Sequence, residues 1–436
     1  MLRQAGYLPV SVDTAVETLT DERVKQARFV GISVPMHTAL RLGQQLAKRV
    51  RSLNPSAHIC FYGLYASLNA DYLLQDCADS TIGGEYEIPI LNLIADLESN
   101  NHLSIPGVST RKQISNPWIQ RISYIVPERN QLPPPDQYAR LEINGDQVLA
   151  GYTETTRGCK HTCLHCPITP IYHGRFFAIP AGIVLADIRT QAARGVRHIT
   201  FGDPDFLNGP THALRITRAL HAEFPNMTFD ATIKIEHLLK HRNLLLELRD
   251  LGCAFIVSAV ESINDDVLRH LDKGHTSAQV SETFDLMEQV GIPLRPSLMP
   301  FSPWETLESY IALLAFFEEH RLIEHVDPVH FSIRLLIPPG SSLLDTPDDK
   351  MWLGELDAAA YTYRWTHPDP RMDTLHQEVS KLVEKAQSVR ADPIETFFHI
   401  KALALEFKGQ KMCVSCAIQD YGTRKVVPHL TESWFC

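Results

Sequence analysis

Three cysteines lie within eight residues of the sequence: Cys159, Cys163 and Cys166 form the spacing C-x3-C-x2-C. They follow residues 150–155, whose pattern predicts a strand, so we expect the cysteines in the loop after that strand. Three thiolates on one short loop can bind three irons of a [4Fe-4S] cluster. The fourth iron is then open to a small-molecule ligand, which a catalytic cluster needs and an electron-carrying cluster avoids.

A zinc site is the alternative for the same cysteines. Thiolates bind zinc together with imidazoles in many structural sites. The histidines close enough in the sequence are His161, His165 and His173. The position of the cysteines between a predicted strand and a helix favours the iron–sulfur cluster.

The cysteine spacing after a strand resembles that of the radical S-adenosylmethionine (SAM) superfamily. The resemblance implies that Cys159, Cys163 and Cys166 hold a [4Fe-4S] cluster whose open iron binds the amino and carboxylate groups of SAM. It also implies that an electron from the cluster breaks a carbon–sulfur bond of SAM. We therefore expect a small-molecule substrate and a reductant such as flavodoxin or ferredoxin.

Further positions resemble the SAM-binding residues of that superfamily. They are Gly202, Asp203, Pro204, Asp205, Lys234, Glu261 and Lys273. The first four close the second predicted strand and resemble a Gly-Gly-Glu motif whose backbone carbonyls bind the SAM ammonium group. Because the motif here is Gly-Asp-Pro-Asp, the contacting atoms stay open. Lys234 ends the third strand. Glu261 and Lys273 belong to a Glu-Ser…Lys-Gly-His-Thr run similar to radical enzymes with a cobalamin-type leading domain, which implies contacts with polar groups of the cofactor. A carboxylate at a helix start is the alternative for Glu261.

Strands and helices that must position these residues alternate over residues 150–340. The pattern predicts strands at residues 150–155, 198–202, 228–232, 254–258, 292–298 and 329–333. Helical patterns lie between them, at residues 181–194, 211–223, 238–251, 264–271, 277–290 and 305–320. Six such units predict a partial (β/α)6 radical SAM barrel, with the reactive groups at the carboxyl ends of the parallel strands.

Residues 1–100 show a shorter alternation of the same kind. Strands are predicted at residues 29–34, 57–63 and 79–82, and helices at residues 2–6, 38–53 and 85–97. This order indicates an α/β domain with a doubly wound, Rossmann-like sheet. Residues 101–149 lose the alternation and are rich in proline, so we predict an extended linker that wraps over the body of the protein.

The leading domain resembles the cobalamin-binding domains that are fused to radical enzymes. The resemblance rests on residues 32–36, 62–66 and 83–87, and it makes cobalamin a candidate third cofactor. The Asp-x-His-x-x-Gly signature, whose histidine binds cobalt, is absent from the sequence. The glycines at positions 63, 83 and 84 can let the backbone approach a flat ligand, or they can serve tight turns.

A second group of cysteines lies in residues 341–436, a region that is predicted to be mainly helical. Cys413, Cys416 and Cys436 are grouped near its end. Thiolates grouped in this way suit a thiophilic centre, such as an auxiliary iron–sulfur cluster, zinc or trivalent arsenic. An exposed Cys-x-x-Cys pair without a function is the alternative.

Residues 300–307 and 326–341 resemble a group of radical SAM enzymes with cysteine-rich tails, which includes the arsinothricin-biosynthesis enzymes. This resemblance implies that Cys413, Cys416 and Cys436 hold arsenite, and that the aminocarboxypropyl group of SAM is transferred to arsenic. The tail departs from the Cys-Cys-Ala-Glu-Pro ending found in relatives. The alternatives are a cobalamin-dependent radical SAM methyltransferase and, in another class, a non-catalytic metal or thiol sensor.

The composition argues against other kinds of partner. The net charge is −10 with no long run of either sign, which disfavours nucleic acid binding. No apolar stretch is long enough to cross a bilayer and no signal peptide opens the chain, so we expect no membrane contact and a cytoplasmic location. In that reducing compartment the nine cysteines are predicted to be ligands or packed thiols rather than disulfides.

Overall fold

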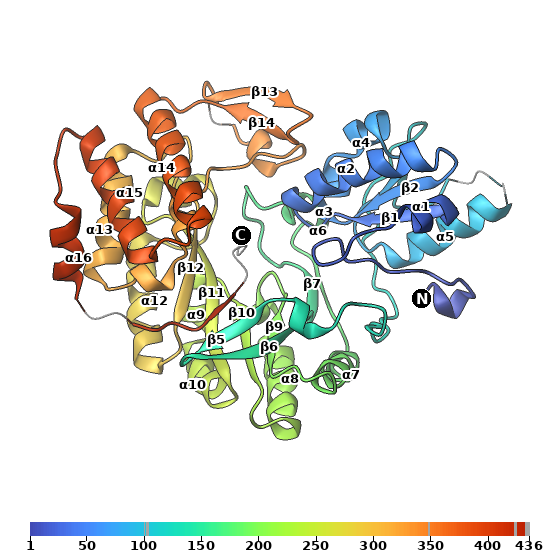
Figure 1. Ribbon diagram of the computed structural model, residues 1–436, viewed down its shortest axis with the longest axis horizontal. Coiled ribbons are helices and arrows are strands. Elements are labelled where there is room, and N and C mark those ends of the chain that lie inside the picture. Colours follow the sequence, from blue (N-terminus) through green and yellow to red (C-terminus); the bar gives the residue numbers. More distant parts are fainter. Residues whose placement is uncertain (100, 102–103, 348, 423–424, 432–436) are drawn as a thin grey trace.

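Two α/β units and a helical C-terminal region make up the computed structural model (Figure 1). The structure describes residues 1–99, 101, 104–347, 349–422 and 425–431. The first unit contains a four-stranded sheet in the order β1-β2-β3-β4, and the second a seven-stranded sheet in the order β12-β11-β10-β9-β6-β5-β15. The predicted α/β class and the helical C-terminal region are therefore confirmed.

The N-terminal sheet is covered by helices on both faces. Strands β1 (Phe29–Ser33), β2 (His58–Tyr62) and β3 (Ser80–Ile82) are parallel, and β4 (Val108–Thr110) runs antiparallel to β3. Since side chains alternate along a strand, Ile59 and Phe61 of β2 pack in one core cluster, whereas Cys60 between them packs in another. The helices of this unit are η1 (Arg3–Ala5), α1 (Asp21–Gln26), α2 (His37–Leu53), α3 (Leu64–Leu68), α4 (Ala70–Asp76) and α5 (Glu87–Ser99).

Two details of this unit differ from the prediction. The strand order is sequential, so the four described strands lack the reversal of order that a doubly wound sheet contains. Residues 2–6 form only the short 3-10 turn η1, and the helix that precedes β1 is α1, which the sequence pattern did not indicate because it is only six residues long.

The segment that the sequence predicted as an extended linker supplies strand β4 and packs against the N-terminal sheet. Trp118 forms an isolated parallel bridge with Gly84, and its carbonyl accepts a 2.8 Å hydrogen bond from the backbone nitrogen of Glu85. A Cβ atom at Gly84 would lie 2.4 Å from the Trp118 carbonyl oxygen, and one at Gly83 would lie 2.5 Å from Ser67 Oγ. These two glycines therefore make room for the chain's own backbone and side chains. The linker region also contains η2 (Pro135–Gln137).

The seven-stranded sheet forms a curled half-barrel (Figure 1). Its parallel strands are β6 (Asp146–Thr153), β9 (His198–Phe201), β10 (Thr228–Thr232), β11 (Cys253–Glu261) and β12 (Leu294–Leu298), and β5 (Arg140–Ile143) and β15 (His429–Leu430) extend it in antiparallel fashion. The helices are α7 (Ala181–Ala192), α8 (Pro210–Glu223), α9 (Ile235–Lys240), α10 (Arg242–Asp250), α11 (Asp265–His270), α12 (Ser277–Val290) and α13 (Leu307–Glu319).

The sixth predicted strand, at residues 329–333, is wrong. The chain forms the 3-10 helix η5 (Pro328–Phe331) there, after the similar turn η4 (Ile323–His325). Pro328 occupies the first helical position, where the fixed φ of proline favours a helical turn. Phe331 is buried beneath α13, where the Tyr310 hydroxyl donates to the Phe331 carbonyl at 2.9 Å, and Val329 and Ile333 are half-buried. The apolar pattern of this segment therefore reflects packing against a helix and not pairing in the sheet.

Residues after the barrel form η6 (Ser342–Asp345), a hairpin of β13 (Leu353–Asp357) and β14 (Thr362–Trp365), and then α14 (Pro370–Ser388), α15 (Pro393–Phe407) and α16 (Val414–Tyr421). The hairpin was not predicted. Strand β15 then returns to the half-barrel, where Leu430 pairs with Leu141. Among the described residues, the helices are too short or too polar to span a bilayer.

We expect Gly84→Ala to destabilise the chain more than Gly145→Ala. Both residues have φ near +80°, which costs a side chain about 1–2 kcal/mol. Only Gly84 adds a clash, with the Trp118 carbonyl, because nothing lies within 4 Å of a Cβ at Gly145. Overpacking adds about 1–3 kcal/mol. Urea unfolding of both variants measures the difference in the free energy of unfolding. Equal losses would show that the segment around Trp118 shifts and relieves the clash.

Candidate metal centre and cofactor site

The three cysteines lie in a loop that begins and ends in a two-stranded finger. Strand β7 (Thr156–Gly158) pairs antiparallel with β8 (Phe176–Ala178), and helix α6 (Thr169–Tyr172) lies between them. Cys159 and Cys163 are buried and Cys166 is half-buried. The Cys163 carbonyl accepts hydrogen bonds from Cys166 N at 3.2 Å and Thr169 Oγ1 at 2.9 Å, which fixes the turn between the last two cysteines. We call residues 156–178 the cysteine loop.

The donor set of this loop fits an iron–sulfur cluster. Burial, together with the neighbouring Cys163 and Cys159, raises the pKa of the Cys166 thiol to about 11. Burial likewise raises the pKa of Cys159. Thiolates removed from water need positive charge beside them, which the irons of a cluster would provide. Lys234 contributes as well, because its Nζ lies 3.6 Å from Cys163 Sγ.

Glu261 lies at the end of β11 in an unusual conformation. Its φ is +66°, and the pairing of β11 with β12 shifts register between Ala259 and Glu261. Lys273 Nζ donates to Glu261 Oε1 at 3.0 Å, and His165 Nε2 lies 3.3 Å from the same oxygen. Burial would raise the pKa of Glu261, but Lys273 and His165 outweigh it and hold that pKa well below its usual range. Strained backbone of this kind is found mostly at functional sites.

Glu261 does not cap the following helix, which was the alternative interpretation. The N-cap of α11 is Asn264, whose side chain accepts from Asp266 N at 2.9 Å. The structure therefore brings together three of the predicted cofactor residues, Lys234, Glu261 and Lys273, around the cysteine loop.

His275 also faces this region. Its Nε2 lies 3.3 Å from the Val260 carbonyl, and its buried Nδ1 has no hydrogen-bond partner among the described residues. Burial lowers the pKa of His275 to about 4, and the Lys273 ammonium lowers it further. The imidazole is therefore neutral, and with Nε2–H donating to Val260, Nδ1 is an acceptor. The sequence run Lys-Gly-His-Thr marked this position but gave it no role.

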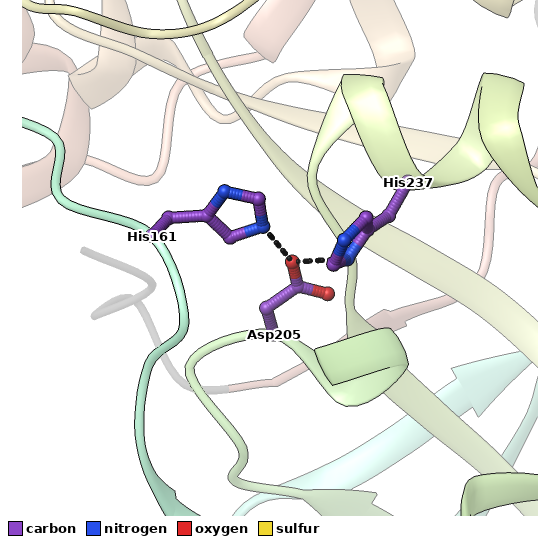
Figure 2. Close-up of side chains that lie close together, drawn as sticks. All are labelled: His161, Asp205 and His237. Carbon is purple, nitrogen blue, oxygen red and sulfur yellow. Dashed lines mark ion pairs between the residues drawn. The ribbon is translucent and has the colours of Figure 1, made fainter. Parts of the chain in front are cut away.

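The Gly-Asp-Pro-Asp segment after β9 directs its carboxylates into the protein. Asp203 accepts from Thr155 N at 2.9 Å and from Thr155 Oγ1 at 2.7 Å. Burial raises the pKa of Asp203 to about 6, although these hydrogen bonds act in the opposite direction. A Cβ at Gly202 would lie 1.9 Å from the Tyr152 hydroxyl oxygen. Asp205 turns toward His161 and His237 (Figure 2). Because both carboxylates contact the protein itself, the backbone carbonyls are the groups of this segment that remain for SAM. Their contact with SAM stays a prediction.

Arg157 joins the cysteine loop to the N-terminal domain, a contact that sequence reasoning missed. Its Nη1 donates to Glu85 Oε2 at 3.0 Å and to Glu87 Oε1 at 2.6 Å. Tyr172 donates to the other oxygen of Glu85 at 2.9 Å. Glu154, at 3.1 Å from Arg157 Nε, completes the group, which we call the Arg157 clamp. The position of Arg157 two residues before Cys159 was the only signal of this contact in the sequence.

The tail cysteines lie elsewhere. Cys413 and Cys416 are exposed at the start of α16 and form a disulfide with Cα atoms 5.4 Å apart. Figure 1 places α16 at the outer edge of the molecule, beyond α13 and α15. The expectation of free thiols fails here because residues three apart lie on the same side of a helical turn. Cys436 lies outside the described residues. Only the reduced pair could bind arsenite, and that role stays a prediction.

Comparison with known proteins identifies the barrel. Residues 153–316 match the radical SAM superfamily. An uncharacterized methyltransferase of Pyrococcus horikoshii is 22% identical over 371 residues, which cover 82% of this chain and 77% of that protein. The ribosomal protein uS12 methylthiotransferase RimO of Geobacter sulfurreducens is 26% identical over 230 residues, 46% of this chain and 48% of RimO. Both relatives are named as transferases.

Two solved structures share the architecture. The cobalamin-dependent SAM radical enzyme OxsB, with aqua-cobalamin and SAM bound, matches with a TM-score of 0.65 and 15% identity over 91% of this chain and 66% of its own. The radical SAM methyltransferase TsrM of Kitasatospora setae, with cobalamin and a [4Fe-4S] cluster bound, matches with a TM-score of 0.61 and 15% identity over 92% of this chain and 90% of its own. At this identity the likeness shows the fold. The superfamily uses a [4Fe-4S] cluster and SAM, in agreement with the predicted cofactors, and its enzymes need a reductant.

We expect Lys273→Met to destabilise the chain by about 3–5 kcal/mol, because it leaves the buried Glu261 carboxylate without its main partner. The matched control is Lys381→Met, which breaks the exposed pair with Glu378 and costs less than about 1 kcal/mol. Urea unfolding of the cluster-free chain measures both. A loss for Lys273→Met no larger than for the control would show that Glu261 is neutral or reaches water.

Proposed function

Since residues 153–316 form a radical SAM domain, we propose that this chain is a radical SAM methyltransferase that acts on a small molecule. The Arg157 clamp is the observation that carries the proposal. It holds Glu85 and Glu87, which follow the carboxyl end of β3, against the strand that leads into the cysteine loop. A ligand at the carboxyl edge of the N-terminal sheet would therefore face the cysteines. This two-domain arrangement recurs in the TsrM and OxsB folds.

The residues of the site have distinct tasks in this proposal. When bound, the [4Fe-4S] cluster supplies an electron and an open iron for the amino and carboxylate groups of SAM. Cys159, Cys163 and Cys166 hold it in a buried loop that limits access of water. Lys273 keeps the carboxylate of Glu261 ionised, the form that accepts hydrogen bonds from hydroxyl or ammonium groups of the cofactor.

A cavity lies between the N-terminal domain, the cysteine loop and the segment after the barrel. Its volume of about 460 Å³ is enough for part of a cobalamin molecule but not for all of it. Its lining is Ser67, Leu68, Pro117, Pro170, Ile171, His173, Pro339, Gly340, Ser342 and Asp345. The histidine in this lining, His173, belongs to the cysteine loop and not to the N-terminal domain. In the N-terminal domain, Gly83 and Gly84 are covered by Ser67 and Trp118 of the chain itself. The lining residues therefore form a cavity, but the N-terminal domain does not supply the histidine that usually binds cobalt. The proposal is that cobalamin binds in the cavity, without a protein ligand to cobalt from that domain.

Transfer of the aminocarboxypropyl group to arsenite is the second candidate. Its support is the resemblance of residues 300–307 and 326–341 to the cysteine-tail enzymes. The described part of the tail adds none, because Cys413 and Cys416 are exposed on α16 and no contact joins them to the cysteine loop. A metal or thiol sensor would not consume SAM, and the relatedness to transferases argues against it.

The products of SAM distinguish these functions. With the reconstituted chain, dithionite and added cobalamin as the methyl acceptor, we expect S-adenosylhomocysteine from methyl transfer and 5′-deoxyadenosine from reductive cleavage of SAM, and we expect arsenite to leave both products unchanged. Cys163→Ser should lower SAM consumption at least 100-fold because the cluster loses a ligand, whereas Cys416→Ser should stay within twofold of wild type. If methylthioadenosine is the main product and Cys416→Ser loses activity, the function is transfer of the aminocarboxypropyl group to arsenite and not methyl transfer. If the wild-type chain with its reconstituted cluster leaves SAM intact, the non-catalytic metal or thiol sensor is favoured.

Cobalamin binding is tested at the cavity. We expect aquacobalamin to titrate into the full chain with a change in its visible spectrum, and Ser342→Trp to weaken binding at least tenfold by filling the cavity. Asn243→Trp is the control, because it places the same side chain at the second cavity, beside α8 and α10. Binding that is equal in both variants would mean that cobalamin, if bound, uses another place.

A further inference from the structure

Three buried side chains beside the cysteine loop converge on one point. His161 belongs to the loop, two residues after Cys159, Asp205 follows β9, and His237 lies in α9. Figure 2 shows both imidazole rings directed at the carboxylate of Asp205. One nitrogen of each histidine and one carboxylate oxygen all lie within 4.8 Å of one another. We call this group the His161–Asp205–His237 triad.

The converging atoms form ion pairs with one another but make no hydrogen bond among the described residues. His161 Nε2 lies 3.2 Å and His237 Nδ1 2.8 Å from Asp205 Oδ2, yet none of these three atoms has a partner in hydrogen-bond geometry within the described ranges. The side chains are 14%, 4% and 0% exposed, respectively. The other oxygen of Asp205 is satisfied, since it accepts from Leu207 N at 3.1 Å. Buried polar atoms without partners are rare and call for a missing ligand or ion.

We propose that this triad binds a divalent transition metal ion of the Zn²⁺ or Fe²⁺ type, separate from the iron–sulfur cluster. Two imidazoles and one carboxylate are a common donor set for such ions. Ligand atoms about 2.1 Å from one ion lie about 3.0–3.4 Å apart in octahedral or tetrahedral geometry, close to the two separations measured here. An ion at this point would give each of the three unsatisfied atoms a partner.

The surroundings resemble those of a metal-bound histidine. Glu236 Oε2 lies 3.7 Å from Nδ1 of His161, the nitrogen that faces away from Asp205. A carboxylate behind a ligating histidine orients the ring and strengthens it as a ligand. His241 lies near His237, with ring centroids 5.5 Å apart, but outside the group whose atoms converge.

The ion would act as a positioning element for the cysteines. His161 lies between Cys159 and Cys163, whereas Asp205 and His237 follow two adjacent strands of the half-barrel, β9 and β10. Binding all three would tie the centre of the cysteine loop to the barrel rim. This inference does not depend on the proposed methyl transfer, because it concerns nitrogen and oxygen donors that the cluster does not use.

Cobalt(II) is the probe that separates this site from the cysteines. In the full chain with Cys159, Cys163 and Cys166 all changed to serine, we expect one Co²⁺ per chain with visible d–d absorption and no thiolate charge-transfer band. His237→Gln in this background should lower the Co²⁺ affinity at least 100-fold. His241→Gln, the matched control, should change it less than threefold. His161→Gln repeats the test at the more exposed ligand, and circular dichroism checks that each variant is folded.

Metal content of the cluster-loaded wild type provides the second readout. We expect one zinc, or one iron beyond the four of the cluster, per chain after gel filtration, and its loss in His237→Gln with the cluster absorption retained. Absence of both the extra ion and the Co²⁺ band would overturn the proposal and leave the three side chains to pair only with one another. Equal Co²⁺ binding by the His237 and His241 variants would overturn it as well.

Discussion

The removal of three thiols from much of the solvent, two of them buried and one half-buried, is the constraint that shapes the surrounding structure. Thiolates removed from water must be offset by nearby positive charge, or they become protonated. The chain places Lys234 within 3.6 Å of Cys163 and brings Lys273 to the same region. Each lysine in turn has a carboxylate close by, Glu236 at 3.7 Å and Glu261 at 3.0 Å. The site is therefore a set of paired charges, and removal of one member leaves another buried without compensation.

The loop that carries these thiols is held by every unit of the chain. The Arg157 clamp connects it to the N-terminal domain. Leu164 donates its backbone nitrogen to the Leu271 carbonyl of the barrel at 3.0 Å and accepts from Ser341 Oγ, in the segment after the barrel, at 3.4 Å. A loop fixed from three directions loses little further entropy when a cofactor binds, which is the physical advantage of a preorganised site. The function of the N-terminal domain thus includes positioning as well as any ligand that it holds.

Local sequence signals predicted most of the fold and the core of the site. The cysteine spacing predicted the loop, and the period-two and helical patterns placed β1, β2, β9 and β10 within one or two residues. The failures came where tertiary contacts decide. Residues 329–333 are apolar because they lie under α13, not because they pair in the sheet. The pairing of Arg157 with Glu85, 72 residues away, has no local signal, because only folding brings the two units together.

The Gly-Asp-Pro-Asp segment shows how a motif-like position can serve the loop rather than the cofactor. Asp203 and Asp205 are two residues apart, and their side chains reach different parts of the cysteine loop. Asp203 accepts hydrogen bonds from Thr155 and from Thr156, the first residue of the loop, whereas Asp205 pairs with His161 nearer the centre of the loop. Two carboxylates from one strand end therefore hold the loop at two separate points. Because both side chains are used in this way, the part of the segment that remains for SAM is its backbone, as in the Gly-Gly-Glu motif that it resembles.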